Sequence, residues 1–189
     1  RYKNLSADYQ RKVFDFYRIT YKTSQSKKEA LRYAKKLFDH DLNQFKKTPS
    51  DAHGKLLTSS GVALARAQWT LHQEKSAIKT LAKLDSELPR VFPHWEIYFT
   101  RARIAEENGN LKLAFAEYKK INQELTDDKN PTLWNQGWLH YKSANYVEAL
   151  SFFERIQSIP DFDQGKRSQA LFWMAKSLKQ MNKKEEAEK

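Results

Sequence analysis

Cysteine is absent from this 189-residue sequence, and glycine and proline occur only five times each. The lack of cysteine excludes disulfide bonds, thiolate metal sites and a cysteine nucleophile, although it does not identify a cellular compartment. The few glycines and prolines fall mainly between periodic segments, which favours long helices over many short strands. The sequence therefore predicts an all-α protein.

Long apolar runs are also missing. No stretch of eighteen consecutive apolar residues occurs, so no membrane-spanning segment is predicted. The sequence begins with RYKNLSADYQ, without an initiator methionine or the apolar core of a signal peptide, and it ends at KKEEAEK within an expected helix. We therefore expect the chain to be a processed or trimmed part of a longer protein.

Basic residues outnumber acidic ones by 34 to 23, which gives a net charge of +11. Such a charge favours anionic partners through an attraction that salt weakens. The lysines are dispersed, however, and the densest basic segment, residues 27–36, alternates with apolar residues as on a solvated helix face. Because no zinc-finger, KH or RRM signature is present, nucleic acid is not an expected partner.

The sequence does not bring together the residues of a catalytic or metal site. Its five histidines stand apart from one another, and Asp39 and Asp41 around His40 are better explained as a solvated helix end. The glutamate pairs at 106–107 and 185–186 lie beside predicted turns, where water would not raise a pKa as cleavage of a glycan requires. Phosphate-binding and nucleophile motifs are missing. No catalytic residue, metal or cofactor is expected in this chain.

A pattern of small residues recurs along the chain. Alanines that follow a turn-like segment stand at positions 30, 77, 114, 149 and 187, with spacings of 47, 37, 35 and 38 residues. Periods of about 34 to 40 residues are typical of helical-hairpin repeats, which bury their apolar faces only by stacking on one another.

The clearest repeat covers residues 133–156. Leu133, Gly137 and Tyr141 are four residues apart in an expected first helix, a break falls at 143–145, and Ala149 opens the apolar face of a second helix. This unit resembles a tetratricopeptide repeat (TPR), in which small residues mark the closest approach of the two helices. A glycine costs a helix about 1 kcal/mol in propensity, and close packing would offset that cost.

Equivalent small residues can be assigned along the chain. The positions expected to let consecutive helices nest are Ala65, Ala102, Gly137 and Ala175 in first helices and Ala77, Ala114, Ala149 and Ala187 in second helices. The sequence thus predicts an all-α, right-handed superhelix of antiparallel helix pairs, a TPR-like α-solenoid that forms one domain over residues 1–189. The pairs are expected at about residues 8–46, 55–87, 94–125, 131–158 and 167–189. The first pair fits least well, because Arg18 occupies its small-residue position.

From about residue 95 onward the sequence also resembles the superhelical region of soluble lytic murein transglycosylases. The matching features are a glycine–tryptophan pair in a repeat helix, a loop with a proline, and an arginine-led helix. They correspond to Gly137, Trp138, Pro160, Arg167, Ala170, Leu171, Trp173, Ala175, Ser177 and Leu178. The resemblance implies a periplasmic scaffold of the bacterial cell envelope that positions peptidoglycan, or a partner, for a lysozyme-like catalytic domain. The E-S and G-L-M-Q motifs of that domain do not occur in this chain.

Aromatic side chains are the candidate ligand-binding residues. Trp134, Trp138 and Tyr141 share one stripe of an expected helix, and Phe99 and Phe172 occupy corresponding positions in adjacent repeats. Aromatic rings stack on sugars and on peptide side chains, although such a stripe also suits simple packing between repeats. Two functions remain open: a non-catalytic scaffold of a lytic transglycosylase-like protein, and a TPR-type adaptor that binds a peptide or protein in its concave groove.

Overall fold

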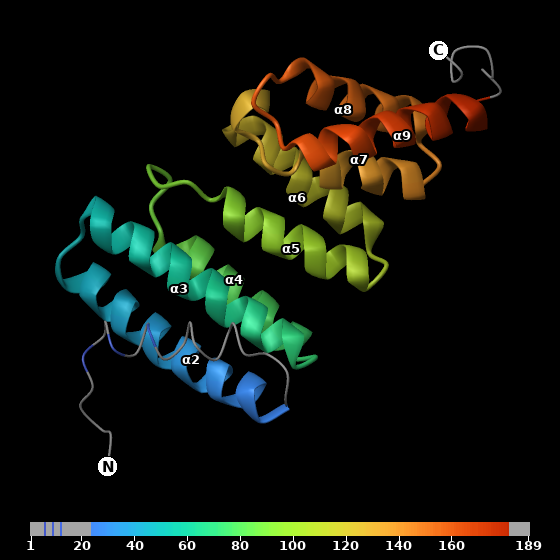
Figure 1. Ribbon diagram of the computed structural model, residues 1–189. Helices are drawn as coiled ribbons and strands as arrows, with labels where there is room; N and C mark the ends of the chain where they lie inside the picture. The colour runs from blue at the N-terminus through green and yellow to red at the C-terminus, as the bar shows by residue number, and fades with distance from the viewer. Residues whose placement is uncertain (1–5, 7–8, 10–11, 13–23, 182–189) are drawn as a thin grey trace. The chain divides into compact units, whose positions relative to one another are not determined.

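The computed structural model describes residues 6, 9, 12 and 24–181, which contain eight α-helices, one short 3-10 helix and no strand (Figure 1). The predicted all-α fold is confirmed. The elements are α2 (Ser24–Lys47), α3 (Asp51–Thr70), α4 (Glu74–Glu87), α5 (Trp95–Glu107), α6 (Leu111–Glu124), η1 (Asp127–Lys129), α7 (Leu133–Lys142), α8 (Tyr146–Ser158) and α9 (Gln164–Gln180). The expected helix before residue 22, Arg18, the glutamates at 185–186 and Ala187 lie outside the described residues.

Two helices begin earlier than the apolar pattern indicates. α3 starts at Asp51, before the expected residue 55, because the Ser50 hydroxyl accepts a hydrogen bond from the His53 amide at 3.3 Å. α9 starts at Gln164, before the expected residue 167, because the Asp163 carboxylate accepts one from the Lys166 amide at 2.8 Å. Each polar cap adds most of a helical turn ahead of the buried residues.

The chain divides into two compact units, Arg1–Glu107 and Asn108–Lys189. The described part of the first unit consists of α2 to α5, and that of the second consists of α6 to α9 with η1. The expectation of one domain over residues 1–189 stays a prediction.

The first unit has an apolar core in which α3 packs against both α2 and α4. Its fully or almost fully buried members include Ala34, Phe38, Leu57, Ala65, Leu81, Leu84, Ile97 and Ile104. A Cβ atom on Gly61 would lie 2.7 Å from Leu84 Cδ2 and 3.0 Å from Phe38 Cε2. The expectation that glycines fall mainly between helices was therefore wrong for α3, since Gly61 and Gly54 lie inside it where a neighbouring side chain comes close.

The core of the second unit joins α7, α8 and α9. Leu133, Ala149, Phe153, Ile156 and Ala170 are completely buried in it. A Cβ atom on Gly137 would lie 2.7 Å from Cε1 of Phe153, so α7 meets a large side chain of α8 at the one residue without a side chain. Burying these apolar groups supplies the main stabilisation of the unit, at about 25 cal/mol per Å² removed from water.

The turns after α3, α5 and α7 share one backbone feature. Each contains a single residue with positive φ: His72 at 57°, Gly109 at 70° and Ala144 at 59°. These residues stand seven positions after the small residues Ala65, Ala102 and Gly137. Gly109 thus ends its helix as the sequence predicts, and the same left-handed turn recurs at two residues that are not glycine.

Hydrogen bonds close two of these turns in the same way. After α3, the Gln73 amide donates to the Gln68 carbonyl oxygen at 3.0 Å, and after α7 the Asn145 amide donates to the His140 carbonyl oxygen at 3.0 Å. This six-to-one pattern is the Schellman motif, which satisfies carbonyl groups at a helix end. The turn is therefore built by the backbone and strained only by the side chain at its left-handed position.

Replacing Ala144 with glycine is expected to raise the free energy of unfolding by about 0.5–1 kcal/mol. A left-handed alanine costs about 1–2 kcal/mol, and the extra freedom of glycine in the unfolded chain returns only part of that. Urea denaturation followed by circular dichroism measures the change. The converse substitution, Gly109→Ala, has no atom within 4 Å of the new Cβ, so its loss of stability would report the backbone strain alone. Unchanged or lower stability in Ala144→Gly would contradict the prediction.

Candidate functional site

Aromatic side chains from α7 and α9 contact one another in the second unit. The ring centroid of Trp138 lies 6.1 Å from that of Trp134, 5.8 Å from that of Tyr141 and 4.5 Å from that of Trp173. The Phe172 ring lies 5.1 Å from Trp173. We call these five residues the aromatic face. Sequence reasoning identified four of them and missed Trp173, whose ring joins the stripe only because α9 packs beside α7.

The aromatic face belongs partly to the core and partly to the surface. Trp134, Tyr141 and Trp173 are half-buried and pack against the core of the second unit. Phe172, in contrast, is 54% exposed, and its neighbour Leu171 is 55% exposed. Large apolar side chains that remain open beside a cluster of rings mark a surface that another molecule could cover.

Lysine side chains border the aromatic face. The Lys176 ammonium lies 5.3 Å from the centroid of the Phe172 ring, and the Lys142 ammonium lies 5.9 Å from that of Trp138. A cation over an exposed ring contributes about 0.5–1 kcal/mol. Apolar rings with cations above them suit a ligand that combines apolar side chains with acidic groups.

The other residues singled out in the sequence lie as follows. Phe99 is a half-buried residue of α5 in the first unit, and its membership of a surface shared with Trp134 stays a prediction. Among the small-residue positions, Ala175 is only half-buried, and Ala187 lies outside the described residues. The others are buried, namely Ala65, Ala77, Ala102, Ala114, Gly137 and Ala149.

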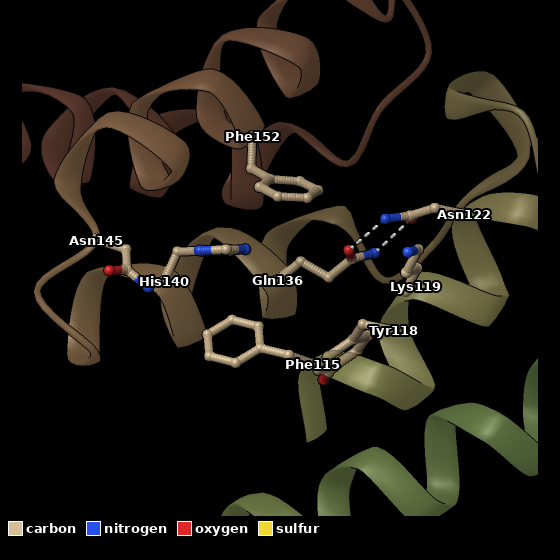
Figure 2. A pocket seen from close by; sticks show the side chains of 8 residues that line it. All are labelled: Phe115, Tyr118, Lys119, Asn122, Gln136, His140, Asn145 and Phe152. Atoms are coloured by element: carbon tan, nitrogen blue, oxygen red, sulfur yellow. Dashed lines mark hydrogen bonds between the residues drawn. The ribbon is translucent and has the colours of Figure 1, made fainter. Parts of the chain in front are cut away.

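A groove of about 340 Å³ opens among α6, α7 and α8, where sequence reasoning placed no site (Figure 2). The ring of His140 lies between Phe115 and Phe152, with centroid distances of 4.6 Å and 5.2 Å. The remaining lining residues are Tyr118, Lys119, Asn122, Gln136 and Asn145. These residues come from three helices, so no local spacing in the sequence signals their meeting.

Side-chain amides hold one end of the groove in place. Asn122 and Gln136 exchange two hydrogen bonds, of 2.8 Å and 2.9 Å, which connect α6 to α7. The Asn130 amide donates to Asn122 at 2.9 Å, and its oxygen accepts from the Thr132 amide at 3.0 Å and from the Thr132 hydroxyl at 2.7 Å. Because Asn130, Thr132 and Gln136 are buried, these bonds are costly to break.

His140 gives the groove a neutral ring. Burial lowers the pKa of His140 below its ordinary value of 6.5, and the Glu148 carboxylate, which raises it, does not compensate. Its Nδ1 atom is buried and has no hydrogen-bond partner among the described residues. At neutral pH the three stacked rings therefore form an uncharged, largely apolar wall.

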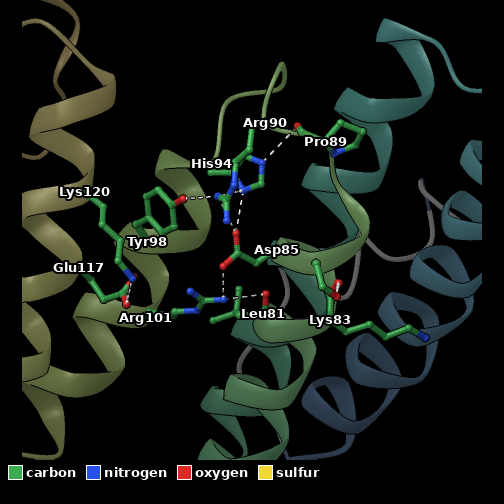
Figure 3. Close-up of polar contacts among 11 residues, drawn as sticks. Leu81, Lys83, Asp85, Pro89, Arg90, His94, Tyr98, Arg101, Glu117 and Lys120 are labelled. Atoms are coloured by element: carbon green, nitrogen blue, oxygen red, sulfur yellow. Dashed lines mark hydrogen bonds and ion pairs between the residues drawn. The ribbon is translucent and has the colours of Figure 1, made fainter.

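Charged side chains of the first unit meet around Asp85 (Figure 3). One carboxylate oxygen lies 2.9 Å from His94 Nδ1 and accepts from Arg90 at 3.1 Å, and the other accepts from Arg101 at 2.9 Å. Arg90 also donates to the Tyr98 hydroxyl at 2.5 Å. Three elements are joined here, since Asp85 belongs to α4, Arg90 and His94 to the following loop, and Arg101 to α5.

The Asp85 cluster has the electrostatics of a structural ion pair. Burial raises the pKa of Asp85, but Arg101, the hydrogen bonds from His94 and Arg101, and Arg90 lower it by more, so the net pKa lies below the ordinary value of 3.8. An ionised carboxylate whose two oxygens are both engaged by donors has no proton to give at neutral pH. We therefore assign the cluster to the stability of the first unit.

Neither a metal centre nor a bilayer-spanning helix is found in the described part of the chain. Within residues 24–181, no three histidine, cysteine, aspartate or glutamate side chains come together as a metal ion would require. None of the helices that the structure describes is both long and apolar enough to cross a lipid bilayer.

Solved structures match this backbone over almost its whole length. A kinesin-light-chain-like protein of Podosopora anserina, built from nearly identical TPR-like repeats, superposes with a TM-score of 0.65 at 15% sequence identity, over 98% of this chain and 92% of that chain. The fold is a TPR-like α-solenoid. A single-residue variant of the same protein gives a TM-score of 0.66 at the same identity and coverage. The predicted TPR-like helical repeat is confirmed, and at this identity the likeness concerns the fold alone.

Neither a protein-family model nor a curated protein matches the sequence. The resemblance to lytic transglycosylases from residue 95 onward receives no support from these comparisons. Peptidoglycan as a ligand and the periplasm as a location therefore stay predictions.

Proposed function

We propose that this protein is a non-catalytic TPR-like scaffold that binds a peptide or protein partner through the aromatic face of its second unit. The observation that carries the proposal is the exposure of Phe172 and Leu171 beside the half-buried rings of α7 and α9. Stacked helical hairpins present extended surfaces to partners, and aromatic anchors dominate the energy of such interfaces.

Magnitudes indicate what the partner must provide. Covering the exposed halves of Phe172 and Leu171 contributes roughly 2–3 kcal/mol. Micromolar affinity corresponds to about 8 kcal/mol, so contacts to these two side chains are not sufficient. The partner must also reach the rings of α7 and the lysines above them. Acidic residues next to its apolar anchors would pair with Lys142 and Lys176.

Selection from a random-peptide display library on the purified chain tests this function. Peptides enriched on the protein are expected to bind the Phe172→Ser variant at least about tenfold more weakly, because removal of an anchor ring commonly costs more than about 1 kcal/mol. Fluorescence anisotropy of labelled synthetic peptides measures the affinity. Val147 of α8 is exposed and lies outside the aromatic face, so Val147→Ser is the matched control. Enriched peptides that bind both variants as tightly as the unaltered protein would overturn the proposal.

A peptidoglycan-positioning role at the same face remains the alternative implied by the lytic transglycosylase resemblance. Aromatic rings stack on sugars as well as on peptide side chains. Titration with soluble glycan fragments separates the two functions, since saturable glycan binding that is lost in Phe172→Ser, without enriched peptides, would favour the scaffold of a cell-wall enzyme.

A further inference from the structure

The groove among α6, α7 and α8 carries a cation without an acidic partner. Lys119 lines the groove, and no ion pair engages it in the part of the chain that the structure describes. Lys120, the next residue of α6, instead pairs with Glu117 at 2.7 Å. No aspartate or glutamate is among the eight lining residues (Figure 2). The electrostatics of the groove therefore favour an anion at Lys119.

The remaining lining residues define the rest of the ligand. Figure 2 shows Lys119 and Asn122 toward one end of the groove and Asn145 toward the other, with the rings of Phe115, His140 and Phe152 between them. The Asn145 side chain makes no capping hydrogen bond to α8, so its amide is open to a ligand. A matching ligand has a negative group, an apolar body beside it, and a polar group farther along.

We propose that this groove binds the C-terminus of a peptide whose last residue is aromatic. In such a residue the carboxylate and the apolar side chain branch from the same carbon, so the carboxylate can reach Lys119 while the ring lies against Phe115 and Phe152. The preceding peptide group then extends toward Asn145. A volume of about 340 Å³ is near the lower limit of small-ligand sites, which suits one terminal residue better than a longer segment.

The chemistry of the contacts sets the specificity. A hydrogen bond between an ammonium and a carboxylate is roughly twice as strong as one between neutral groups, so amidation of the terminus removes the main polar contact. The groove shares no lining residue with the aromatic face, so this proposal does not depend on binding there.

Calorimetric titration with short acetylated peptides tests the proposal. The probes are a peptide ending in glycyl-phenylalanine with a free carboxylate, the same peptide with an amidated end, one ending in glycine, and 3-phenylpropionate alone. We expect saturable binding of the first and affinities at least about tenfold lower for the amide and for the glycine peptide. Equal binding of acid and amide would overturn the proposal, and so would 3-phenylpropionate binding as tightly as the peptide, which would mark a site for small carboxylates.

Variants of α6 locate the contact. Lys119→Met is expected to weaken the free-acid peptide about tenfold and Lys119→Arg to retain most of its binding. Lys112 is exposed on the same helix and lies outside the groove, so Lys112→Met removes an equal charge as the control. Since Lys119 is exposed, neither substitution there should alter the helical circular dichroism signal. Peptide binding that is unchanged in Lys119→Met, or reduced equally in Lys112→Met, would contradict the assignment.

Discussion

Replacing Gly137 with leucine is expected to lower the free energy of unfolding of the second unit by about 3 kcal/mol or more. Even the first added carbon would lie 2.7 Å from Cε1 and 2.9 Å from Cδ1 of Phe153. The Phe153 ring is completely buried among core residues of the unit, so it cannot move aside without opening the core. Overpacking of this kind costs about 1–3 kcal/mol for smaller insertions. Denaturant titration followed by circular dichroism measures the loss.

Smaller changes at the same place identify the cause. Gly137→Ala gains about 1 kcal/mol of helix propensity, which offsets part of the clash with Phe153, so its loss should be much smaller. In the background of Phe153→Leu, which removes the ring, Gly137→Ala should cost less than it does alone. Gly165→Ala in α9 is the control, because its Cβ would meet nothing nearer than an Asp163 oxygen at 3.4 Å. A Gly137→Leu variant as stable as the unaltered protein would refute the close approach of α7 and α8.

Replacing Asp85 with asparagine is expected to destabilise the first unit by about 3 kcal/mol. Asp85 and Arg101 are mostly buried, with side chains 17% and 13% exposed, and His94 is 2% exposed. Removing one partner of a buried ion pair leaves the other charges without compensation, which costs about 3–5 kcal/mol in full burial. Urea denaturation at neutral pH measures the change. Exposed Arg32, which pairs with Glu29 on α2 at 2.7 Å, offers a control, since Glu29→Gln should cost no more than about 1 kcal/mol.

The same substitution should alter the dependence of stability on acid. Because the pKa of Asp85 is lower in the folded protein than its ordinary 3.8, the unfolded chain takes up the proton first as the pH falls. The stability from this carboxylate is thus fully present above its ordinary pKa and is lost as the pH falls through the folded pKa. The difference between Asp85→Asn and the unaltered protein should be greatest near neutral pH and shrink below 3.8. An equal difference at every pH would contradict the linkage.

His140 contributes a separate acid effect in the second unit. Its pKa is lowered by burial, so stability begins to fall as the pH drops below the ordinary histidine value of 6.5. This window lies above that of Asp85 and belongs to the other compact unit. The two effects can therefore be distinguished by the pH at which each appears.

Local patterns were sufficient to predict the helices and the aromatic residues of α7. Four-residue spacing places Leu133, Gly137 and Tyr141 along one helix whatever the rest of the chain does. The groove could not be predicted in this way, because Phe115, His140 and Phe152 face one another only after three helices have packed. The Asp85 cluster was missed for the same reason, since isolated histidines and arginines in the sequence carry no sign of their shared carboxylate.

The left-handed turns at His72, Gly109 and Ala144 have a consequence for how such chains diverge. A histidine, a glycine and an alanine occupy the same backbone geometry, so the hairpin is specified by its main chain and by a few short side chains. Almost every other residue is then free to change in descent, including those by which sequences are usually grouped. Kinship of this kind survives in the path of the backbone long after it has faded from the letters.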